Sequence, residues 1–331
     1  MKVAWFDAEE WEKEYLNEKE PGFKIKFIEK PLNEDTVGRA KGFDAVTVFV
    51  PSKVNEKVIE GLEADLVCCR STGFDHIALE SAEKHRTTVC NVPEYGGPTV
   101  AEHTFGMILA LSRDIYKAIN RVEDGDFEHS GLRGFDLKGK TLGVIGTGSI
   151  GKNVIRIANG FDMDVVAFDP EKDEEAARRM GYMYVSMENL LKDSDIVTLH
   201  CPLNEHTRYL LSKDEFELMD GSMLINTARG GLVNTEALLE ALKNGNVRSA
   251  GLDVLEEECH IEEDIEVVKQ KEDCDLQKVL DGHNLKERED VLITPHNAFN
   301  SEEAMHRIVD TTLENLENRS NPVNQSLQTS T

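Results

Sequence analysis

One segment, residues 141–160, limits the folds open to this chain more than any other part of the sequence. It reads TLGVIGTGSIGKNVIRIANG, in which an apolar run, a G-x-G-x-x-G loop and a helix-like run follow one another. The first glycine allows a tight turn, the second a close approach of the backbone to a ligand, and the third close packing of helix on strand. This context predicts a dinucleotide-binding βαβ unit, with phosphates at the helix N-terminus. The loop residues expected at the dinucleotide are Gly146, Thr147, Gly148, Ser149, Ile150 and Gly151.

Asp169 comes at the end of the next predicted strand and lies 18 residues beyond Gly151, near the spacing of a ribose-binding acid. Its carboxylate can accept hydrogen bonds from a ribose 2′-hydroxyl and would repel a 2′-phosphate. We therefore expect NAD rather than NADP. Two other interpretations stay open on this motif alone: a glycine turn without a ligand, and a related fold that binds another adenosine cofactor.

Short apolar runs alternate with helix-like stretches along most of the chain, the pattern of βαβ units in parallel sheets. A chain of 331 residues can bury two cores, so we expect an α/β protein of two domains. Strands are predicted in a first series at residues 2–6, 24–28, 45–48, 66–69 and 88–91. A second series is predicted at residues 141–145, 164–168, 196–200, 223–226, 249–253 and 291–294.

The segments between and after these series have distinct compositions. Residues 101–113 predict an apolar helix, and the polar, glycine-containing residues 123–140 predict a connection between domains. Residues 256–290 are dense in charge and predict a solvated excursion with some helix. A last helix is predicted at residues 302–319, followed by a frayed polar tail.

The formal net charge of −26 disfavours nucleic acid and anionic lipid as partners, although one cationic pocket can still bind a small anion. No apolar run approaches the roughly 18 residues of a membrane span. The acidic start of the chain lacks the pattern of a signal peptide, so we expect a cytoplasmic protein. The six cysteines show no C-x-x-C spacing and are expected to be reduced. Cys259 and His260 lack a second ligand pair, and no metal is expected.

Three ionisable residues follow consecutive predicted strands of the second series: Arg229, Glu258 and His296. Taken singly, Arg229 fits a surface ion pair, Glu258 a solvated acidic run and His296 a strand-end cap. The carboxyl ends of parallel strands form the ligand crevice of an open α/β sheet, so the three can converge there. The planar guanidinium of Arg229 suits a substrate carboxylate. The imidazole of His296 suits proton donation to a ketone, and Glu258 would orient it and favour its protonated form.

Several runs together resemble the D-2-hydroxyacid dehydrogenases over most of the chain. They are LGVIGTGSIGKNVIRIANGF, SDIVTLHCPLNEHTRYLLS, MLINTARGGLVNTEALLEAL, AGLDV and ITPHNAF. The RSTG and PHNAF strings and the acidic insertion are similar to the D-lactate dehydrogenase branch, including the vancomycin-resistance type. The resemblance implies two Rossmann-like or flavodoxin-like domains with the active site in the cleft between them. It implies a substrate domain of residues 1–100 and 299–331, an NAD domain of residues 101–298, a homodimer, and a small 2-oxo or 2-hydroxy acid such as pyruvate as substrate.

The resemblance also implies roles for individual residues. Thr72 and Gly73 would contact the substrate carboxylate through backbone N–H groups, Tyr95 would close the pocket, and Phe299 would wall the substrate methyl group; core packing is the other interpretation of Tyr95 and Phe299. Asp253 would lie near the nicotinamide carboxamide. Further cofactor contacts implied by the matching runs are His200, Pro202, Thr227 and Ala228.

The loop Gly96-Gly97-Pro98 is richer in glycine than the D-lactate enzymes lead us to expect, which leaves the substrate side chain open. Other family activities therefore stay possible: phosphite oxidation, or action on a bulkier 2-hydroxy acid. A third alternative is an NAD-sensing corepressor, although no added protein-docking region is visible.

Overall fold

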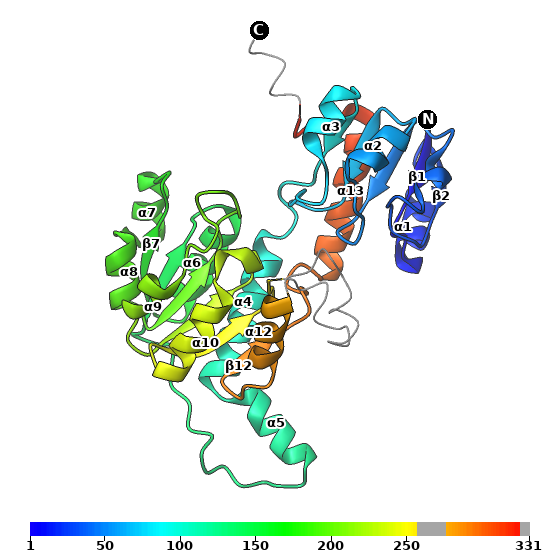
Figure 1. Cartoon of the computed structure of the whole chain (residues 1–331). Coiled ribbons are helices and arrows are strands. Elements are labelled where there is room, and N and C mark those ends of the chain that lie inside the picture. Colours follow the sequence, from blue (N-terminus) through cyan, green and yellow to red (C-terminus); the bar gives the residue numbers. More distant parts are fainter. Residues whose placement is uncertain (257–275, 325–331) are drawn as a thin grey trace. The chain divides into compact units, whose positions relative to one another are not determined.

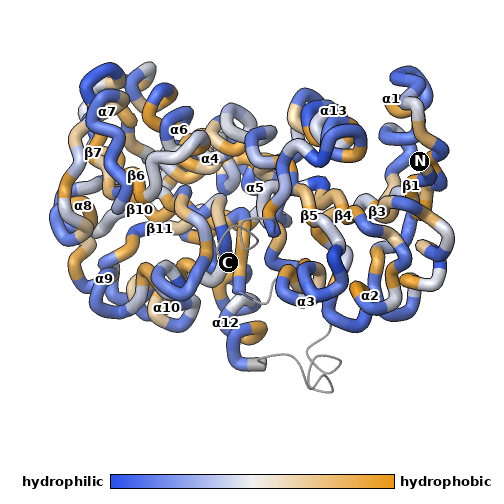
Figure 2. Tube along the Cα trace, turned by 90° about the horizontal axis from the view of Figure 1, so that it is seen from above, coloured by the Kyte–Doolittle hydropathy of each residue, from blue (hydrophilic) through white to orange (hydrophobic). Residues whose placement is uncertain are grey.

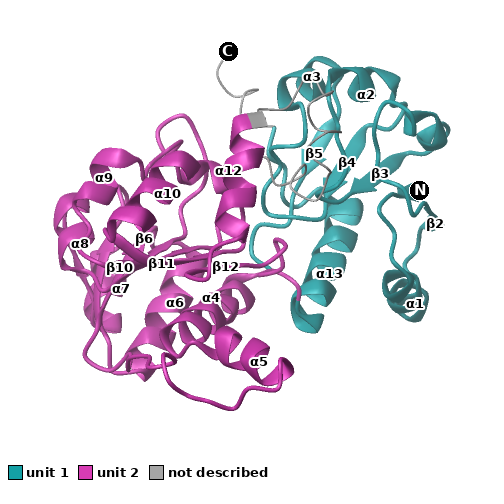
Figure 3. Cartoon of the chain, turned by 60° about the horizontal axis from the view of Figure 1, so that its bottom comes forward, with its two compact units in different colours: residues 1–95, 301–331 teal, residues 96–300 magenta. Residues whose placement is uncertain are grey.

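A computed structural model describes residues 1–256 and 276–324 of the chain (Figure 1). The chain divides into two compact units, Met1–Tyr95 with Ser301–Thr331 and Gly96–Asn300, called unit 1 and unit 2 below (Figure 3). The expected division lay at residues 100/101 and 298/299, a few residues from these limits. Each unit holds one parallel sheet with helices on both faces, which confirms the predicted α/β class.

Unit 1 contains a five-stranded parallel sheet in the order β2-β1-β3-β4-β5. Its strands are β1 (Lys2–Trp5), β2 (Lys24–Phe27), β3 (Ala45–Val48), β4 (Leu66–Cys69) and β5 (Thr88–Cys90). Its helices are α1 (Glu10–Lys19), α2 (Glu56–Gly61), α3 (Leu79–Lys84) and α13 (Glu302–Asn318), with a 3₁₀ turn at Val37–Ala40. Ala4 of β1 and Phe6 just after it share a core with α2 and α3, whereas Val3 and Trp5 share one with α1 and α13. Figure 2 shows α2 and α3 on one face of this sheet and α13 on the other. Burial of both faces explains why the inner strands β3 and β4 are largely apolar, whereas the edge strand β2 keeps two exposed lysines.

The segment after α13 differs from the expected frayed tail. The side chain of Asn324 accepts a hydrogen bond from the Val89 backbone N–H (3.0 Å) and donates one to the Thr87 carbonyl (2.8 Å). Pro322 forms an antiparallel bridge with Cys90. The expectation of a frayed tail is therefore wrong for the residues up to 324. This polar segment supplies hydrogen-bond partners along the edge strand β5, which has no neighbouring strand on that side.

Unit 2 contains a seven-stranded parallel sheet in the order β12-β11-β10-β9-β6-β7-β8. Its strands are β6 (Thr141–Ile145), β7 (Asp164–Phe168), β8 (Met183–Tyr184), β9 (Ile196–Leu199), β10 (Ser222–Asn226), β11 (Val247–Leu252) and β12 (Val291–Ile293). Its helices are α4 (Gly97–Ser112), α5 (Ile115–Glu123), α6 (Ser149–Gly160), α7 (Glu174–Met180), α8 (Met187–Asp193), α9 (Lys213–Glu217), α10 (Thr235–Asn244) and α12 (Leu276–Lys286), with a 3₁₀ turn at Gly230–Leu232.

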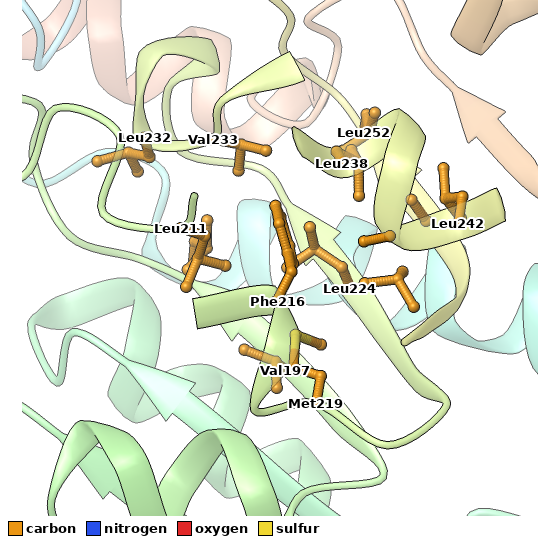
Figure 4. Packing of buried hydrophobic residues seen from close by; sticks show 14 of the residues in the cluster. Val197, Leu211, Phe216, Met219, Leu224, Leu232, Val233, Leu238, Leu242 and Leu252 are labelled. Atoms are coloured by element: carbon orange, nitrogen blue, oxygen red, sulfur yellow. The ribbon is translucent and has the colours of Figure 1, made fainter. Parts of the chain in front are cut away.

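The strand order of unit 2 reverses at β6, since β7 follows on one side and β9 on the other. In an open α/β sheet, ligands bind at the carboxyl ends of the strands beside such a reversal. The core on one face of the sheet surrounds Phe216 of α9, which lies among Val197, Leu211 and Leu224 (Figure 4). This packing fixes the strands whose ends carry the candidate site.

Every predicted strand is present, but the helical regions differ from expectation in three places. The helix predicted from residue 101 begins at Gly97, with Pro98 in its first turn. Proline is tolerated there because a backbone N–H in the first turn has no partner within the helix. A separate helix, α5, precedes the connection at residues 124–140. In the charged stretch expected to be solvated, α12 buries Val279 and Leu285, so that expectation is wrong for this helix.

Candidate active site

The glycine loop after β6 has the geometry of a phosphate cradle. Gly146 has a φ of 96°, and a Cβ on it would lie 2.7 Å from the carbonyl atoms of His200. A Cβ on Gly151 would lie 2.0 Å from the Gly146 oxygen, whereas one on Gly148 would meet nothing within 4 Å. The fold therefore requires the first and third glycines, and the second, at the N-cap of α6, leaves open backbone for a ligand. These residues fit a dinucleotide pyrophosphate.

Asp169 lies directly beside this loop. Its Oδ2 accepts hydrogen bonds from the backbone N–H of Thr147 (2.7 Å) and from the Thr147 hydroxyl (3.0 Å). Its Oδ1 accepts one from the Glu171 N–H (2.9 Å). The carboxylate is thus fixed next to the loop, with one lone pair on Oδ1 left for a ribose hydroxyl.

His200 follows β9, the strand beside the reversal. Its backbone N–H donates to the Ile145 carbonyl (2.7 Å), and its Nε2 lies 2.8 Å from the Thr198 hydroxyl. Its Nδ1 is buried and has no hydrogen-bond partner in the part of the chain that the structure describes. Burial lowers the pKa of His200 to about 3, so the ring is neutral. Pro202 is exposed two residues later and accepts a hydrogen bond from the Thr207 hydroxyl (2.6 Å).

The turn after β10 carries Thr227, Ala228 and Arg229. The Thr227 hydroxyl lies 3.0 Å from that of Thr104 in α4. The Asn226 side chain spans the turn, since it accepts from the Ala228 N–H (3.0 Å) and donates to the Arg229 carbonyl (2.9 Å). The Arg229 guanidinium donates to the Ala228 carbonyl (2.7 Å). The backbone around Arg229 is therefore fixed by its own strand end.

This turn packs directly on the segment after β11. A Cβ on Gly230 would lie 2.2 Å from the carbonyl of Leu255 and 2.7 Å from the nitrogen of Glu256. The two strand ends therefore touch, which requires glycine at position 230. Glu258, predicted to act with His296, lies outside the described residues, as do Cys259 and His260.

Asp253, at the end of β11, holds the loop that carries His296. The residue is 1% exposed. Its Oδ1 accepts from the Thr294 hydroxyl (2.5 Å) and the Asn297 N–H (2.8 Å), and its Oδ2 from the Ala298 N–H (2.9 Å). His296 has a left-handed φ of 49°, and its N–H donates to the Asp253 carbonyl (2.9 Å). A single buried carboxylate thus fixes the backbone on both sides of His296.

Two aromatic neighbours surround this loop. The ring of Phe299 meets that of His296 edge-on, with centroids 6.3 Å apart. His103 of α4, which sequence reasoning missed, places Nε2 3.2 Å from the Thr294 hydroxyl and 3.5 Å from Asp253 Oδ1. Its position in an apolar helix gave no signal of this contact.

In unit 1, Thr72 and Gly73 follow β4. The Thr72 hydroxyl donates to the Val92 carbonyl (2.8 Å), and the Thr72 carbonyl accepts from the Asn91 side chain (2.8 Å). Among the described residues, the backbone N–H groups of Thr72 and Gly73 have no hydrogen-bond acceptor. This turn therefore offers two donors to an anion. Tyr95, the last residue of this segment, accepts a hydrogen bond from Arg307 Nε through its carbonyl (2.9 Å).

Sequence reasoning missed two buried charges that support these loops. Arg70 is 2% exposed, lies 3.5 Å from Glu12 and donates to the Phe6 carbonyl (2.9 Å). Glu256 was expected to be solvated, but it accepts from Tyr209 (2.8 Å) and from the hydroxyl of Thr235 (2.7 Å). The sequence gives no signal that separates these residues from exposed neighbours of the same charge.

Comparison with known proteins agrees with this geometry. The family profile described as "D-isomer specific 2-hydroxyacid dehydrogenase, NAD binding domain" matches residues 105–298. The D-lactate dehydrogenase of Escherichia coli (strain K12) is 38% identical over 324 residues, covering 96% of both chains. The structure titled as identifying the pyruvate reductase of Chlamydomonas reinhardtii superimposes with a TM-score of 0.86 at 37% identity, covering 96% of this chain and 95% of that one.

The D-lactate dehydrogenase of Aquifex aeolicus, solved in complex with NAD and lactic acid, has a TM-score of 0.85 at 31% identity and covers 97% of this chain and 99% of its own. No helix in residues 1–256 and 276–324 is long and apolar enough to cross a bilayer. The chain therefore belongs to the D-isomer-specific 2-hydroxyacid dehydrogenases, oxidoreductases that use NAD and act on CH–OH donors.

Proposed function

We propose that this protein is a D-lactate dehydrogenase that interconverts pyruvate, or a 2-oxo acid of similar size, with its D-2-hydroxy acid. The observation that carries the proposal is the meeting of strand ends in unit 2: Gly230 packs the Arg229 turn on the end of β11, and Asp253 of that end fixes the His296 loop. Relatives named as D-lactate dehydrogenases support the choice of substrate.

Arg229 binds the substrate carboxylate in this proposal. A guanidinium presents paired donors in one plane, which match the two oxygens of a carboxylate. Its contact with the C2 oxygen would strengthen as negative charge develops there, so Arg229 serves the reaction as well as binding. The hydrogen bonds of the Asn226 side chain with the Ala228 N–H and the Arg229 carbonyl support this role, because they restrict the backbone of the turn.

His296 donates the proton that converts the C2 oxygen into a hydroxyl, with Glu258 as the acid that orients its imidazole. NADH, held by the glycine loop after β6 and by Asp169, would supply the hydride that C2 accepts. His296 returns to its protonated form by taking a proton from solvent, and the reverse reaction makes it the general base. The fixed backbone around His296 supports this role, since a proton donor must be held within hydrogen-bond reach of the substrate oxygen.

The other implied residues complete the proposal. Thr72 and Gly73 would donate their backbone N–H groups to the substrate carboxylate, and Tyr95 and Phe299 would limit the space for the substrate side chain. Asp169 would bind the ribose diol, and His200, Pro202, Thr227, Ala228 and Asp253 would contribute to the rest of the cofactor site. The neutral ring and unpartnered Nδ1 of His200 support a polar contact there.

A substrate panel tests this assignment. NADH oxidation is followed with pyruvate, hydroxypyruvate, glyoxylate, 2-oxoisocaproate and phenylpyruvate, and NAD reduction with phosphite. The proposal expects the highest kcat/KM with pyruvate. A clear preference for a bulkier acid or for phosphite would overturn the assignment of pyruvate as substrate but not the family. A protein that binds NADH and turns over none of these compounds would favour a sensing role.

We also propose a homodimer formed through α5. Ile115, Tyr116, Ile119 and Val122 of this helix are 44–53% exposed, and Phe127 just after it is 82% exposed. The helix extends from the sheet of unit 2 (Figures 1 and 3). With about 100 Å² from each of these large side chains, a two-fold contact would bury on the order of 1,000 Å² in total, the lower limit for a specific interface. We favour a second copy of this chain as the partner, because in a two-fold contact each subunit contributes the same apolar patch to the buried area.

Sedimentation analysis tests the dimer. The parent protein should sediment as a dimer, and Ile119→Asp should give a folded monomer. Met183→Asp is the control: it changes an exposed apolar residue of the edge strand β8 and should leave the dimer intact. A parent that stays monomeric at micromolar concentration would contradict the proposal.

A further inference from the structure

A chain of hydrogen bonds leads to Asp169 from the edge of the sheet in unit 2. The hydroxyl of Tyr182 lies 3.2 Å from that of Tyr184, which lies 2.8 Å from the Thr147 hydroxyl. The Thr147 hydroxyl lies 3.0 Å from Asp169 Oδ2. The short strand β8 creates this chain by pairing Tyr184 with Ala167, two residues before Asp169.

The chemistry of the groups sets the direction of every bond in this chain. An ionised carboxylate only accepts, so the Thr147 hydroxyl donates its one proton to Asp169. The Tyr184 hydroxyl must then donate to Thr147. It accepts from the Asp173 backbone N–H (3.1 Å) and, having no proton left to give, also accepts from Tyr182. All donors point toward the carboxylate.

The chain lies in a protected environment, which strengthens its bonds. Thr147 and Tyr182 are both buried, and the two tyrosine rings meet edge-on with centroids 5.3 Å apart. Burial raises the pKa of Tyr182 far above its ordinary value, so its hydroxyl keeps its proton. Hydrogen bonds of this kind polarise one another in a low dielectric.

We propose that Tyr184 is a positioning residue for the cofactor, which fixes Asp169 toward the adenosine ribose through Thr147, with Tyr182 as its outer support. The inference rests on the proposed role of Asp169. Threonine is β-branched and has few rotamers, and the donor from Tyr184 selects the one that points Oγ1 at the carboxylate. Without that donor, the Thr147 hydroxyl is no longer held toward Oδ2 and the carboxylate keeps only its bonds from the Thr147 and Glu171 N–H groups, while Arg229 and His296 are untouched.

The first test is binding of NADH to the enzyme without substrate, measured by the fluorescence of NADH. Tyr184→Phe keeps the ring and removes the hydroxyl, and should raise the Kd for NADH by about threefold to tenfold, the range of one hydrogen bond. The Kd for NADPH should change less, so the preference of the enzyme for NADH over NADPH should become smaller. The KM for pyruvate at saturating NADH should stay the same. Tyr15→Phe is the matched control, because Tyr15 also bonds a carboxylate, that of Asp310, in unit 1 (3.1 Å).

A double-mutant cycle tests whether Tyr184 acts through Thr147. Thr147→Val removes the hydroxyl and should raise the Kd for NADH, whereas Thr147→Ser keeps the hydroxyl and should have a Kd close to that of the parent. In the Thr147→Val background, Tyr184→Phe should raise the Kd further by less than about twofold. Multiplicative effects, or a Tyr184→Phe enzyme that loses thermal stability but keeps its Kd, would overturn the inference. Asp169→Ala separates the two failures: if it alters the NADH preference and Tyr184→Phe does not, only the positioning role fails. If Asp169→Ala changes nothing, both fail.

Discussion

Replacing Asp253 by asparagine should both destabilise unit 2 and displace His296, the proton donor of the proposed reaction. The amide can keep the oxygen that accepts from Thr294 and Asn297, but its NH₂ group then faces the Ala298 N–H, and two donors oppose each other. A hydrogen bond to a charged group contributes about 1.5–3 kcal/mol, and the unpaired Ala298 N–H adds to the loss. We expect the free energy of unfolding to fall by about 2–4 kcal/mol.

Urea unfolding of Asp253→Asn measures this loss, and pyruvate reduction measures its effect on His296. The kcat should fall at least about tenfold, because a displacement near 1 Å already costs that much at a reacting group. Asp162→Asn is the control: its carboxylate is 68% exposed and pairs with Lys138, and such surface pairs contribute less than about 1 kcal/mol. A variant that unfolds and turns over like the parent would refute the role of Asp253 in holding the His296 loop.

Substitutions at three other residues test separate parts of the site. His296→Ala should lower the kcat for ketone reduction by roughly 10²–10⁴ with little change in the Kd for NADH, and a near-normal kcat would remove this residue from the chemistry. Arg229→Lys keeps the charge but loses the planar fork, so it should raise the KM for pyruvate and lower the kcat, with Arg229→Gln worse in both; a remote surface arginine would leave both within about twofold. Because burial holds the pKa of His200 near 3, below its ordinary value of 6.5, the folded protein binds fewer protons there than the unfolded chain between these values. The stability from neutral His200 is therefore complete above about pH 6.5 and is lost as the pH falls toward 3, by about 1–2 kcal/mol at pH 5. His200→Asn should flatten that part of the urea-unfolding profile, and an unchanged slope would show that another group titrates.

Most strands could be predicted because parallel strands buried on both faces are continuous apolar runs, and the edge strand β2 because its apolar residues alternate with lysines. β8 escaped prediction because two residues, Met183 and Tyr184, carry no period, and its position depends on pairing with β7. α5 was missed although Ile115, Ile119 and Val122 recur at the spacing of a helix, and these residues are about half exposed in unit 2. A short edge strand thus depends on a partner that no local pattern records, whereas the apolar stripe of α5 was present in the sequence.

For the site, the motifs named the residues that a ligand would meet, but not those that hold them. Asp253 was expected near the nicotinamide, and both of its oxygens are bonded to the His296 loop. The buried Arg70 and Glu256 are indistinguishable in sequence from solvated charges, because their partners come from distant segments. A charge becomes interior only when the fold brings its partner to it, and no local pattern records that event.

The stereochemistry of the product tests the central claim most directly. Pyruvate and NADH are incubated with the parent enzyme, and the lactate formed is separated on a chiral column and compared with the NADH consumed. The account predicts one D-lactate for each NADH oxidised, with no L-lactate. Formation of L-lactate, or NADH binding with no lactate at all, would contradict it.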